Sequence, residues 1–395
     1  MAGVSPAPSG TYTSYDLTVG VKLNVENVIW TLSPFDVPLQ GTMGADGRTA
    51  LSSDTCFEKK IEWLDEVLLT ASATLTNNIT TGDTVLTVTA TGSNAGMGAP
   101  ANQFKVGDVI LVDSEYVYVT AYGTTTPSST IVVTRAFGGS TAVNHTTSSV
   151  IKGVGQALAE GSDAGVARAV DRVNRNNYTQ IFGPVPVQVS GSENAVQKYG
   201  LSGTEFDHQV ANRLKETFVD LEHALLYGTQ YESSTLNART MGGFTNYIST
   251  NVDSSTTTIS ESTLLTQLQA CFDAGGSPDR IVVGSKQKQA LSGLAGGGNG
   301  NTTPLIRYMQ DTNIRGQIVD YYDSDFGRQM IVLDRWCRKS DLFIFNRDQA
   351  TIATLRPFMF EMLAKTGDST KGQIVGEKSL WFRKQQQAAR FSALT

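Results

Sequence analysis

The chain has 395 residues, a formal net charge of −6 and only 17% charged residues. This length predicts two or three domains with a substantial buried core. Residues 1–100 carry 4 basic and 10 acidic side chains, whereas residues 301–395 carry 14 basic and 10 acidic ones. Neither end is a basic arm of the kind that binds nucleic acid tightly, which argues against a dedicated nucleic-acid-binding protein.

Three widely separated cysteines, Cys56, Cys271 and Cys337, form no C-x-x-C motif. This spacing argues against a disulfide framework or a zinc site and suits a reducing compartment. Residues 1–10 are small and rich in proline, so we expect no signal peptide. No apolar run reaches the roughly 18 residues that a membrane-spanning helix needs, so we expect no membrane partner.

Residues 1–55 are predicted to form an extended N-terminal arm, because prolines and glycines interrupt any regular element. The arm nevertheless contains apolar residues that need burial: Val21, Leu23, Val25, Val28, Ile29 and Trp30. Two interpretations remain open, namely packing on a neighbouring copy or packing on the chain's own domain.

Two extended segments follow at a distance from each other. Phe57–Leu69 alternates weakly, and we favour a strand over a short helix. In Tyr178–Ser190, Pro184 and Pro186 exclude a central strand. We expect these two segments to pair as a long hairpin. Residues 156–176 show instead a short helical pattern, carried by Val166, Ala169, Val170 and Val173.

Residues 71–154 differ in composition from the rest, with 17 threonines between positions 71 and 150. Phe104–Thr120 is typical of a hairpin that turns at Asp113-Ser114, and Ile131–Thr134 is a further short strand. Short strands separated by regular turns predict a small all-β barrel or sandwich. The abrupt change in composition indicates an inserted domain.

A long helix is predicted from Ser202 to about Tyr231. Ser202 and Glu205 form an S-x-x-E capping box, and Gly228 supplies a residue that can turn left-handed beyond the end. The apolar stripe consists of Phe206, Val210, Leu214, Phe218, Leu221 and Leu225. The charged residues between them, Asp207, Arg213, Lys215, Glu216, Asp220 and Glu222, are expected mostly on the other side.

The remaining chain alternates helices and strands without a strict βαβ repeat, which predicts an α+β fold. Helices are expected over Glu261–Phe272 and Ser285–Leu294, and a flexible loop over Ala295–Thr303. The expected strands are Arg280–Val283, Ile314–Tyr322, Gln329–Leu333, Leu342–Phe345, Ile352–Leu355 and Gly376–Arg383.

Catalytic motifs are absent: the sequence lacks H-E-x-x-H, G-x-G-x-x-G and G-x-S-x-G. Gly367–Gly372 has the spacing of a phosphate-binding loop, but Gln373 and Ile374 replace the required Lys and Ser/Thr. The basic residues near the C-terminus lack the interleaved aromatics that nucleic-acid stacking uses. They are Lys371, Lys378, Arg383, Lys384 and Arg390.

Two acid-x-x-His pairs, Glu205/His208 and Asp220/His223, resemble those of di-metal helical bundles. They lie 15 positions apart on one helix, about 22 Å along its axis, and so cannot share a site in one chain. We interpret them as surface hydrogen bonds or subunit contacts. His145 lies in a Thr-rich turn, with no partner evident from the sequence. We therefore predict no catalytic, cofactor-binding or metal-binding residues, no cofactor and no enzymatic activity.

The run NYTQIFGPVPVQVSGSENAVQKYGLSGTEFDHQVANRLKETFVDLEHALLYG, which ends at Gly228, resembles the major capsid proteins of tailed bacteriophages, which have the Hong Kong 97-like fold. DRIVVGSKQKQAL and the ending LAKTGDSTKGQIVGEKSLWFRKQQQAARF are also similar. By element order the resemblance covers most of residues 1–70 and 155–395. These are fold signatures, so they imply no active site.

The resemblance implies an N-terminal arm over 1–55 and an extended loop over 56–70 and 155–192. A peripheral domain is expected over 193–284 and 356–395, with its spine helix at 202–230, and an axial domain over 285–355. The inserted all-β domain at 71–154 departs from the minimal fold.

The implied function is that of a virion structural protein, which assembles in the host cytoplasm as hexamers and pentamers into an icosahedral head around the DNA genome. Expected partners are further copies of the chain, separate scaffolding and portal proteins, and non-specifically contacted DNA; decoration proteins are a further candidate. Two alternatives remain open: an encapsulin-like shell that encloses protein cargo, and a surface-binding module in the β insertion.

Overall fold

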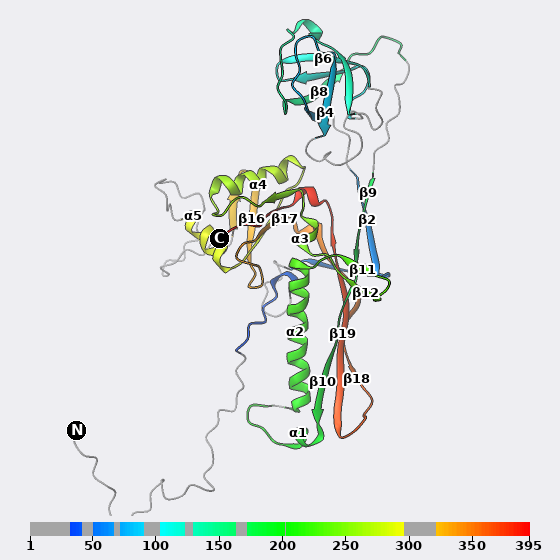
Figure 1. The fold of residues 1–395 in the computed structure, drawn as a ribbon. Coiled ribbons are helices and arrows are strands. Elements are labelled where there is room, and N and C mark those ends of the chain that lie inside the picture. Colours follow the sequence, from blue (N-terminus) through cyan, green and yellow to red (C-terminus); the bar gives the residue numbers. More distant parts are fainter. Residues whose placement is uncertain are drawn as a thin grey trace, which may run out of the picture.

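The computed structural model shows two β-sheets packed against one long helix, together with a two-stranded ribbon and a β-barrel (Figure 1). The barrel lies at the far end of the ribbon, away from the two sheets. The structure describes residues 32–41, 50–66, 72–90, 103–122, 129–162, 172–201, 203–295 and 321–395. The predictions for the apolar arm residues 21–30 and for the loop residues 296–303 lie outside these ranges.

The long helix α2 spans Glu205–Tyr227, a shorter range than predicted. Its N-cap is Thr204, whose side-chain oxygen accepts a hydrogen bond from the Asp207 backbone N–H at 3.2 Å. The predicted capping box was therefore wrong, since Glu205 is already the first helical residue; Ser202 itself lies outside the described residues. Thr204 caps the helix instead, with the acidic residue Asp207 three positions later.

Gly228 follows α2, but its φ of −57° is not left-handed, so that prediction was also wrong. Glycine is needed here for space. A Cβ on Gly228 would lie 2.5 Å from the carbonyl oxygens of both Ala224 and Met241. The residue lets the chain after α2 pass directly against the end of the helix.

A four-stranded sheet lies along α2 in the order β1-β18-β19-β10. Its strands are β1 (Ser52–Thr55), β18 (Ala350–Met362), β19 (Ser369–Phe382) and β10 (Gln180–Ser190). β10 is an edge strand, as Pro184 and Pro186 predict, because proline has no N–H for a second neighbour. The short helix α1 (Gly191–Ala195) follows β10 and lies near the far end of the sheet (Figure 1).

A six-stranded sheet lies at the other end of α2, in the order β13-β20-β17-β14-β16-β15. Its strands are β13 (Asn251–Asp253), β20 (Ala389–Phe391), β17 (Leu342–Phe345), β14 (Arg280–Val283), β16 (Gly327–Leu333) and β15 (Tyr321–Ser324). Helices α4 (Glu261–Asp273) and α5 (Ser285–Ala295) accompany it. β14 lies at its centre because Ile281, Val282 and Val283 are all fully buried.

The domain boundaries expected at 284/285 and 355/356 stay a prediction, and each sheet takes strands from more than one of the predicted ranges. β14 and α4 lie in the predicted peripheral range 193–284, yet they belong with the six-stranded sheet. β18 begins at Ala350, within the predicted axial range 285–355, and belongs to the four-stranded sheet. The last strand, β20, returns to the six-stranded sheet. The chain crosses between the sheets several times, because each sheet recruits strands by long-range pairing.

The ribbon pairs β2 (Lys60–Glu66) with β9 (Arg172–Tyr178) in antiparallel register. The strand predicted within Phe57–Leu69 is therefore present. Its expected partner was wrong except at Tyr178, which pairs with Lys60, because Gln180–Ser190 pairs with β19 instead. The helix expected over 156–176 is contradicted at Arg172–Asn176, which are extended; residues 163–171 lie outside the described part. Val173 faces Asp65 across the ribbon.

The barrel closes in the order β3-β4-β7-β6-β5-β8. Its strands are β3 (Ser72–Leu75), β4 (Val85–Ala90), β5 (Asp108–Val112), β6 (Glu115–Tyr122), β7 (Thr130–Thr134) and β8 (Val150–Gln156). Apolar side chains alternate inward and form a separate core that includes Leu86, Ile110, Val117 and Ile131. Closure leaves no unpaired edge within this small sheet.

Short elements complete the fold: the 3₁₀ turn Pro38–Gln40, the hairpin of β11 (Tyr231–Ser233) and β12 (Ala238–Thr240), and α3 (Phe244–Tyr247). None of the helices in the described ranges is both long and apolar enough to cross a membrane.

The main core centres on Phe244 of α3, which is fully buried. Its ring centroid lies 4.8 Å from that of Phe345, 5.5 Å from that of Phe382 and 5.8 Å from that of Phe343. Phe343 and Phe345 belong to the six-stranded sheet, whereas Phe382 ends β19 of the four-stranded sheet. Leu225 and Leu226 of α2 complete the same cluster. One side chain thus joins both sheets and the long helix.

Substitution Phe244→Ala is expected to lower the free energy of unfolding by about 3–5 kcal/mol, because it leaves a cavity where three elements meet. Denaturant titration followed by circular dichroism measures this loss. Phe272→Ala is the matched control, since Phe272 of α4 is 55% exposed. Equal losses for the two variants would contradict the central role of Phe244.

Candidate functional site

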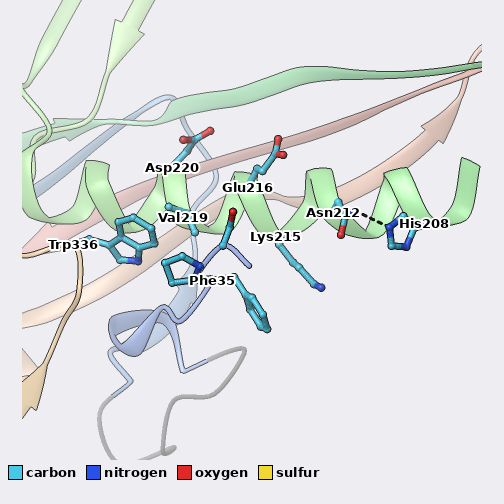
Figure 2. A pocket seen from close by; sticks show the side chains of 10 residues that line it. Phe35, His208, Asn212, Lys215, Glu216, Val219, Asp220 and Trp336 are labelled. Carbon is cyan, nitrogen blue, oxygen red and sulfur yellow. Dashed lines mark hydrogen bonds between the residues drawn. The ribbon is translucent and has the colours of Figure 1, made fainter. Parts of the chain in front are cut away.

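The first acid-x-x-His pair on α2 does not form a site. The Glu205 carboxylate accepts hydrogen bonds from Lys198 Nζ at 3.0 Å and Gln209 Nε2 at 2.7 Å. His208 Nε2 lies instead 3.1 Å from Asn212 Nδ2 (Figure 2). The histidine and its acid therefore have separate partners on the helix surface.

The second pair is also separated. The His223 ring packs edge-on against Trp336, with centroids 4.9 Å apart. Burial raises the pKa of Asp220, which lines a surface groove. Across the described ranges, no three His, Cys, Asp or Glu side chains are placed to hold a metal ion.

The groove on this side of α2 has a volume of about 480 Å³ (Figure 2). Its walls are arm residues 33–35, the exposed side of α2 and Trp336. Lys215 Nζ lies 4.7 Å from the centroid of the Phe35 ring, a cation–π contact across the groove. The lining mixes apolar and charged groups, with no nucleophile paired to a base. This arrangement suits contact between chain segments rather than catalysis.

Arm residues 36–40 lie against α2 beside this groove. Leu39 is buried, and its N–H donates to Glu222 Oε1 at 2.8 Å. Gln40 Nε2 donates to Glu222 Oε2 and to the Phe218 carbonyl oxygen, each at 2.7 Å. Trp336 Nε1 donates to the Asp36 carbonyl oxygen at 2.8 Å. This part of the arm therefore packs on its own chain.

Glu222 was expected on the polar side of the helix, which was wrong, because it is fully buried. Its position offers a signal, since it lies four residues after Phe218 and four before Leu226 on one stripe. Burial raises the pKa of Glu222, and the nearby Asp334 carboxyl raises it further. Burial also raises the pKa of Asp334.

The barrel holds the second buried polar cluster. His145 was expected to have no partner, and this was wrong. Its Nδ1 lies 2.7 Å from Asp113 Oδ2, and its Nε2 lies 3.0 Å from Glu115 Oε2. Both ring nitrogens of His145 therefore face carboxyl oxygens. The sequence signal is Asp113-x-Glu115, which places two acids around one hairpin turn.

Arg135 completes this cluster. Its Nε donates to Glu115 Oε1 at 2.7 Å, and its terminal nitrogen donates to Oε2 at 2.6 Å. Burial alone raises the pKa of Glu115, but hydrogen bonds from Arg135, His145 and the Val143 and Ala136 amides outweigh it. They lower the pKa to about 2. The cluster binds three loops of the barrel to one carboxylate and leaves no exposed nucleophile or vacant ligand set.

Exposed apolar side chains gather at the end of the β18–β19 hairpin. Met359 and Met362 of β18 are 50% and 67% exposed, and the adjacent Leu363 is 42% exposed. Val196 and Tyr199, which follow α1, are also exposed. Exposed apolar groups concentrated at one end of a protein are typical of an interaction surface.

The basic residues near the C-terminus do not form one patch. Lys378 donates to Thr354 Oγ1 at 3.0 Å, and burial lowers its pKa. Arg383 stacks on Trp381 with its guanidinium carbon 5.3 Å from the ring centroid. Arg390 lies on β20 of the other sheet and donates to the Thr245 carbonyl oxygen. Their bonds are internal, which gives no support to a nucleic-acid groove.

Substitution Glu115→Gln is expected to weaken the barrel by about 3–5 kcal/mol at neutral pH, because Arg135 and His145 lose their shared carboxylate. In the wild type, the same stabilisation is present above the ordinary carboxyl pKa of about 4.5 and is lost as pH falls towards about 2, since folding lowers the pKa of Glu115. Hydrogen exchange of the barrel strands measures both effects.

Glu66→Gln is the control, because Glu66 forms an exposed ion pair with Arg172 in the ribbon and such pairs contribute little. Barrel stability that falls equally with acid in the wild type and in Glu115→Gln would contradict the assignment to this carboxylate.

Comparison with solved structures places this architecture among phage capsids. Cyanophage A-1(L) capsid asymmetric unit matches with a TM-score of 0.53 and 12% identity, covering 97% of this chain and 100% of the other. Structures of Microbacterium phage Oxtober96 and Mycobacterium phage Bobi each match with a TM-score of 0.50 and 11% identity. They cover 97% of this chain and 99% and 98% of their own. At these identities the likeness shows the Hong Kong 97-like fold alone.

No curated protein matches the sequence. The family model of the SU10 major capsid protein, however, matches residues 7–395, nearly the whole chain. The predicted resemblance to tailed-phage capsid proteins is thereby confirmed at the level of sequence as well as fold. The chain belongs to the SU10 major capsid protein family.

Proposed function

We propose that this capsid protein assembles as hexamers and pentamers into the icosahedral head of a tailed phage and encloses its DNA genome. The observation that carries the proposal is the family match over residues 7–395. The role is structural, with no catalytic step, and assembly takes place in the host cytoplasm with separate scaffolding and portal proteins.

Cohesion between subunits would come from apolar burial. Met359, Met362 and Leu363 at the end of the β18–β19 hairpin are exposed in the single chain. Obligate assemblies bury large interfaces that resemble a protein core cut in half. Covering these side chains with a neighbouring copy would remove their contact with water and stabilise the shell.

Expression of the chain, with and without its scaffolding partner, tests this function by electron microscopy of the purified product. Closed shells with six-fold and five-fold capsomers are the expected result, and particles from infected cells should contain nuclease-protected DNA. A protein that stays monomeric under all these conditions would contradict the proposal. Shells that enclose protein cargo without DNA would favour the encapsulin-like alternative.

We further propose that the barrel lies outside the shell wall and is displayed on its surface. The barrel has its own core, separate from that of the two sheets, and lies beyond the end of the ribbon (Figure 1). A displayed domain is also available for decoration proteins or a host surface. Its removal should therefore leave the fold of the remaining chain intact.

The pairing of β2 with β9 shows where the barrel can be deleted without disturbing the ribbon. Glu66 of β2 lies opposite Arg172 of β9, so an Asn-Gly turn can join them in place of residues 67–171. We expect this variant to fold and to form shells like those of the full chain. A folded variant that forms no shells would show that the barrel makes contacts needed for assembly. A control that keeps the barrel but carries Asp113→Asn separates loss of the domain from local damage to it.

A further inference from the structure

Glu222 of α2 is the buried group around which arm residues 36–40 are held. Its two carboxyl oxygens accept hydrogen bonds from the Leu39 N–H at 2.8 Å and from Gln40 Nε2 at 2.7 Å. Both donors belong to the arm. The attachment of the arm to α2 therefore depends on the state of one carboxyl group.

Two buried acceptor atoms of this region have no hydrogen-bond partner in the described structure, Gln40 Oε1 and Asp334 Oδ2. Asp334 is fully buried in the loop after β16, and its other oxygen accepts from the Trp336 N–H at 2.9 Å. Buried acceptors without a donor are rare in proteins and call for an explanation. A proton bound to a carboxyl group in this region would turn that group into a hydrogen-bond donor.

The charges around Glu222 favour such a proton. From the arm, Asp36 faces it; from the loop after β16, Asp334 does. The nearby Arg335 pairs with Asp36 at 2.8 Å and is exposed, and His223 of α2 packs on Trp336. Within the described ranges, no ion pair joins Glu222 or Asp334 to a cation. Two ionised carboxylates here would be buried without compensation, which is strongly unfavourable.

We propose that arm residues 36–40 dock on α2 with uptake of one proton by the buried acids Glu222 and Asp334, and that loss of this proton releases the arm. One proton on these two carboxyls leaves a single negative charge at the buried site instead of two. The same neutral Glu222 still accepts from Leu39 and Gln40. The latch is a property of the single chain and does not depend on shell formation.

The direction of the pH effect follows from the raised pKa of Glu222. In the released state the carboxyl ionises in its ordinary range near pH 4.5, whereas in the docked state it stays neutral to higher pH. Docking is therefore fully favoured at low pH. It weakens about tenfold per pH unit as pH rises between the two pKa values, because one proton is lost on release.

Hydrogen exchange of the full chain, resolved to peptides that contain Leu39, tests the latch between about pH 5 and 9. After correction for intrinsic exchange, we expect the protection of this segment to fall by about tenfold per pH unit over the lower part of this range. Protection that stays constant from pH 5 to 9 would overturn the proposal.

Two variants identify the groups. Glu222→Gln cannot ionise, so the pH dependence should vanish whatever the absolute protection. Asp334→Asn removes the second carboxyl and offers a donor in its place, so the fall should move to lower pH. Glu216→Gln, on the exposed side of the same helix, is the matched control and should behave as the wild type. A Glu222→Gln chain that retains the wild-type fall would refute the role of Glu222, and circular dichroism confirms that each variant is folded.

Discussion

The close packing of α2 and α3 between the two sheets is the constraint on which the rest of the fold depends. The chain leaves α2 at Gly228 and enters α3 after Gly243, whose N–H donates to the Gly228 carbonyl oxygen at 2.8 Å. A Cβ on Gly243 would lie 2.5 Å from the Ala224 carbonyl oxygen. Two glycines thus allow backbone to meet backbone. This contact places Phe244 where β17 and β19 can both reach it.

Buried carboxylates show how the same chemical group is handled in two opposite ways. Glu115 in the barrel receives hydrogen bonds from Arg135, His145 and two backbone amides, which lower its pKa despite burial. Within the described residues, Glu222 receives hydrogen bonds from Leu39 and Gln40 alone, with further acids nearby, and burial raises its pKa. The number and charge of donors, rather than depth, decide the outcome. The carboxylate of Glu115 stabilises the barrel over a wide pH range. Our proposal for Glu222 makes the attachment of arm residues 36–40 dependent on pH.

Local pattern predicted the individual elements well. The apolar stripe of α2, the helix α4 and the hairpin turning at Asp113 all follow from periodicity and turn residues within a few positions. The pairing of strands that lie far apart in the sequence was harder to predict. β2 has no local feature that selects β9 over β10, because strand partners are chosen by register across the whole chain.

The polar contacts were the hardest to predict. His145 meets its partners only when the barrel closes, and Glu222 is covered only because the arm, the helix and a distant loop converge on it. Because acidic side chains are rarely buried, residue type alone predicts that Glu222 is exposed. The absence of a catalytic motif, in contrast, needed no tertiary information, because such motifs are short and local.

The ribbon of β2 and β9 also has a mechanical meaning. Seven paired residues on each strand span about 23 Å, enough to hold an attached domain clear of the body that carries it. Its two strands end side by side, so whatever they carry needs only adjacent termini. A domain attached at these two strand ends therefore adds no strand to either sheet of the body.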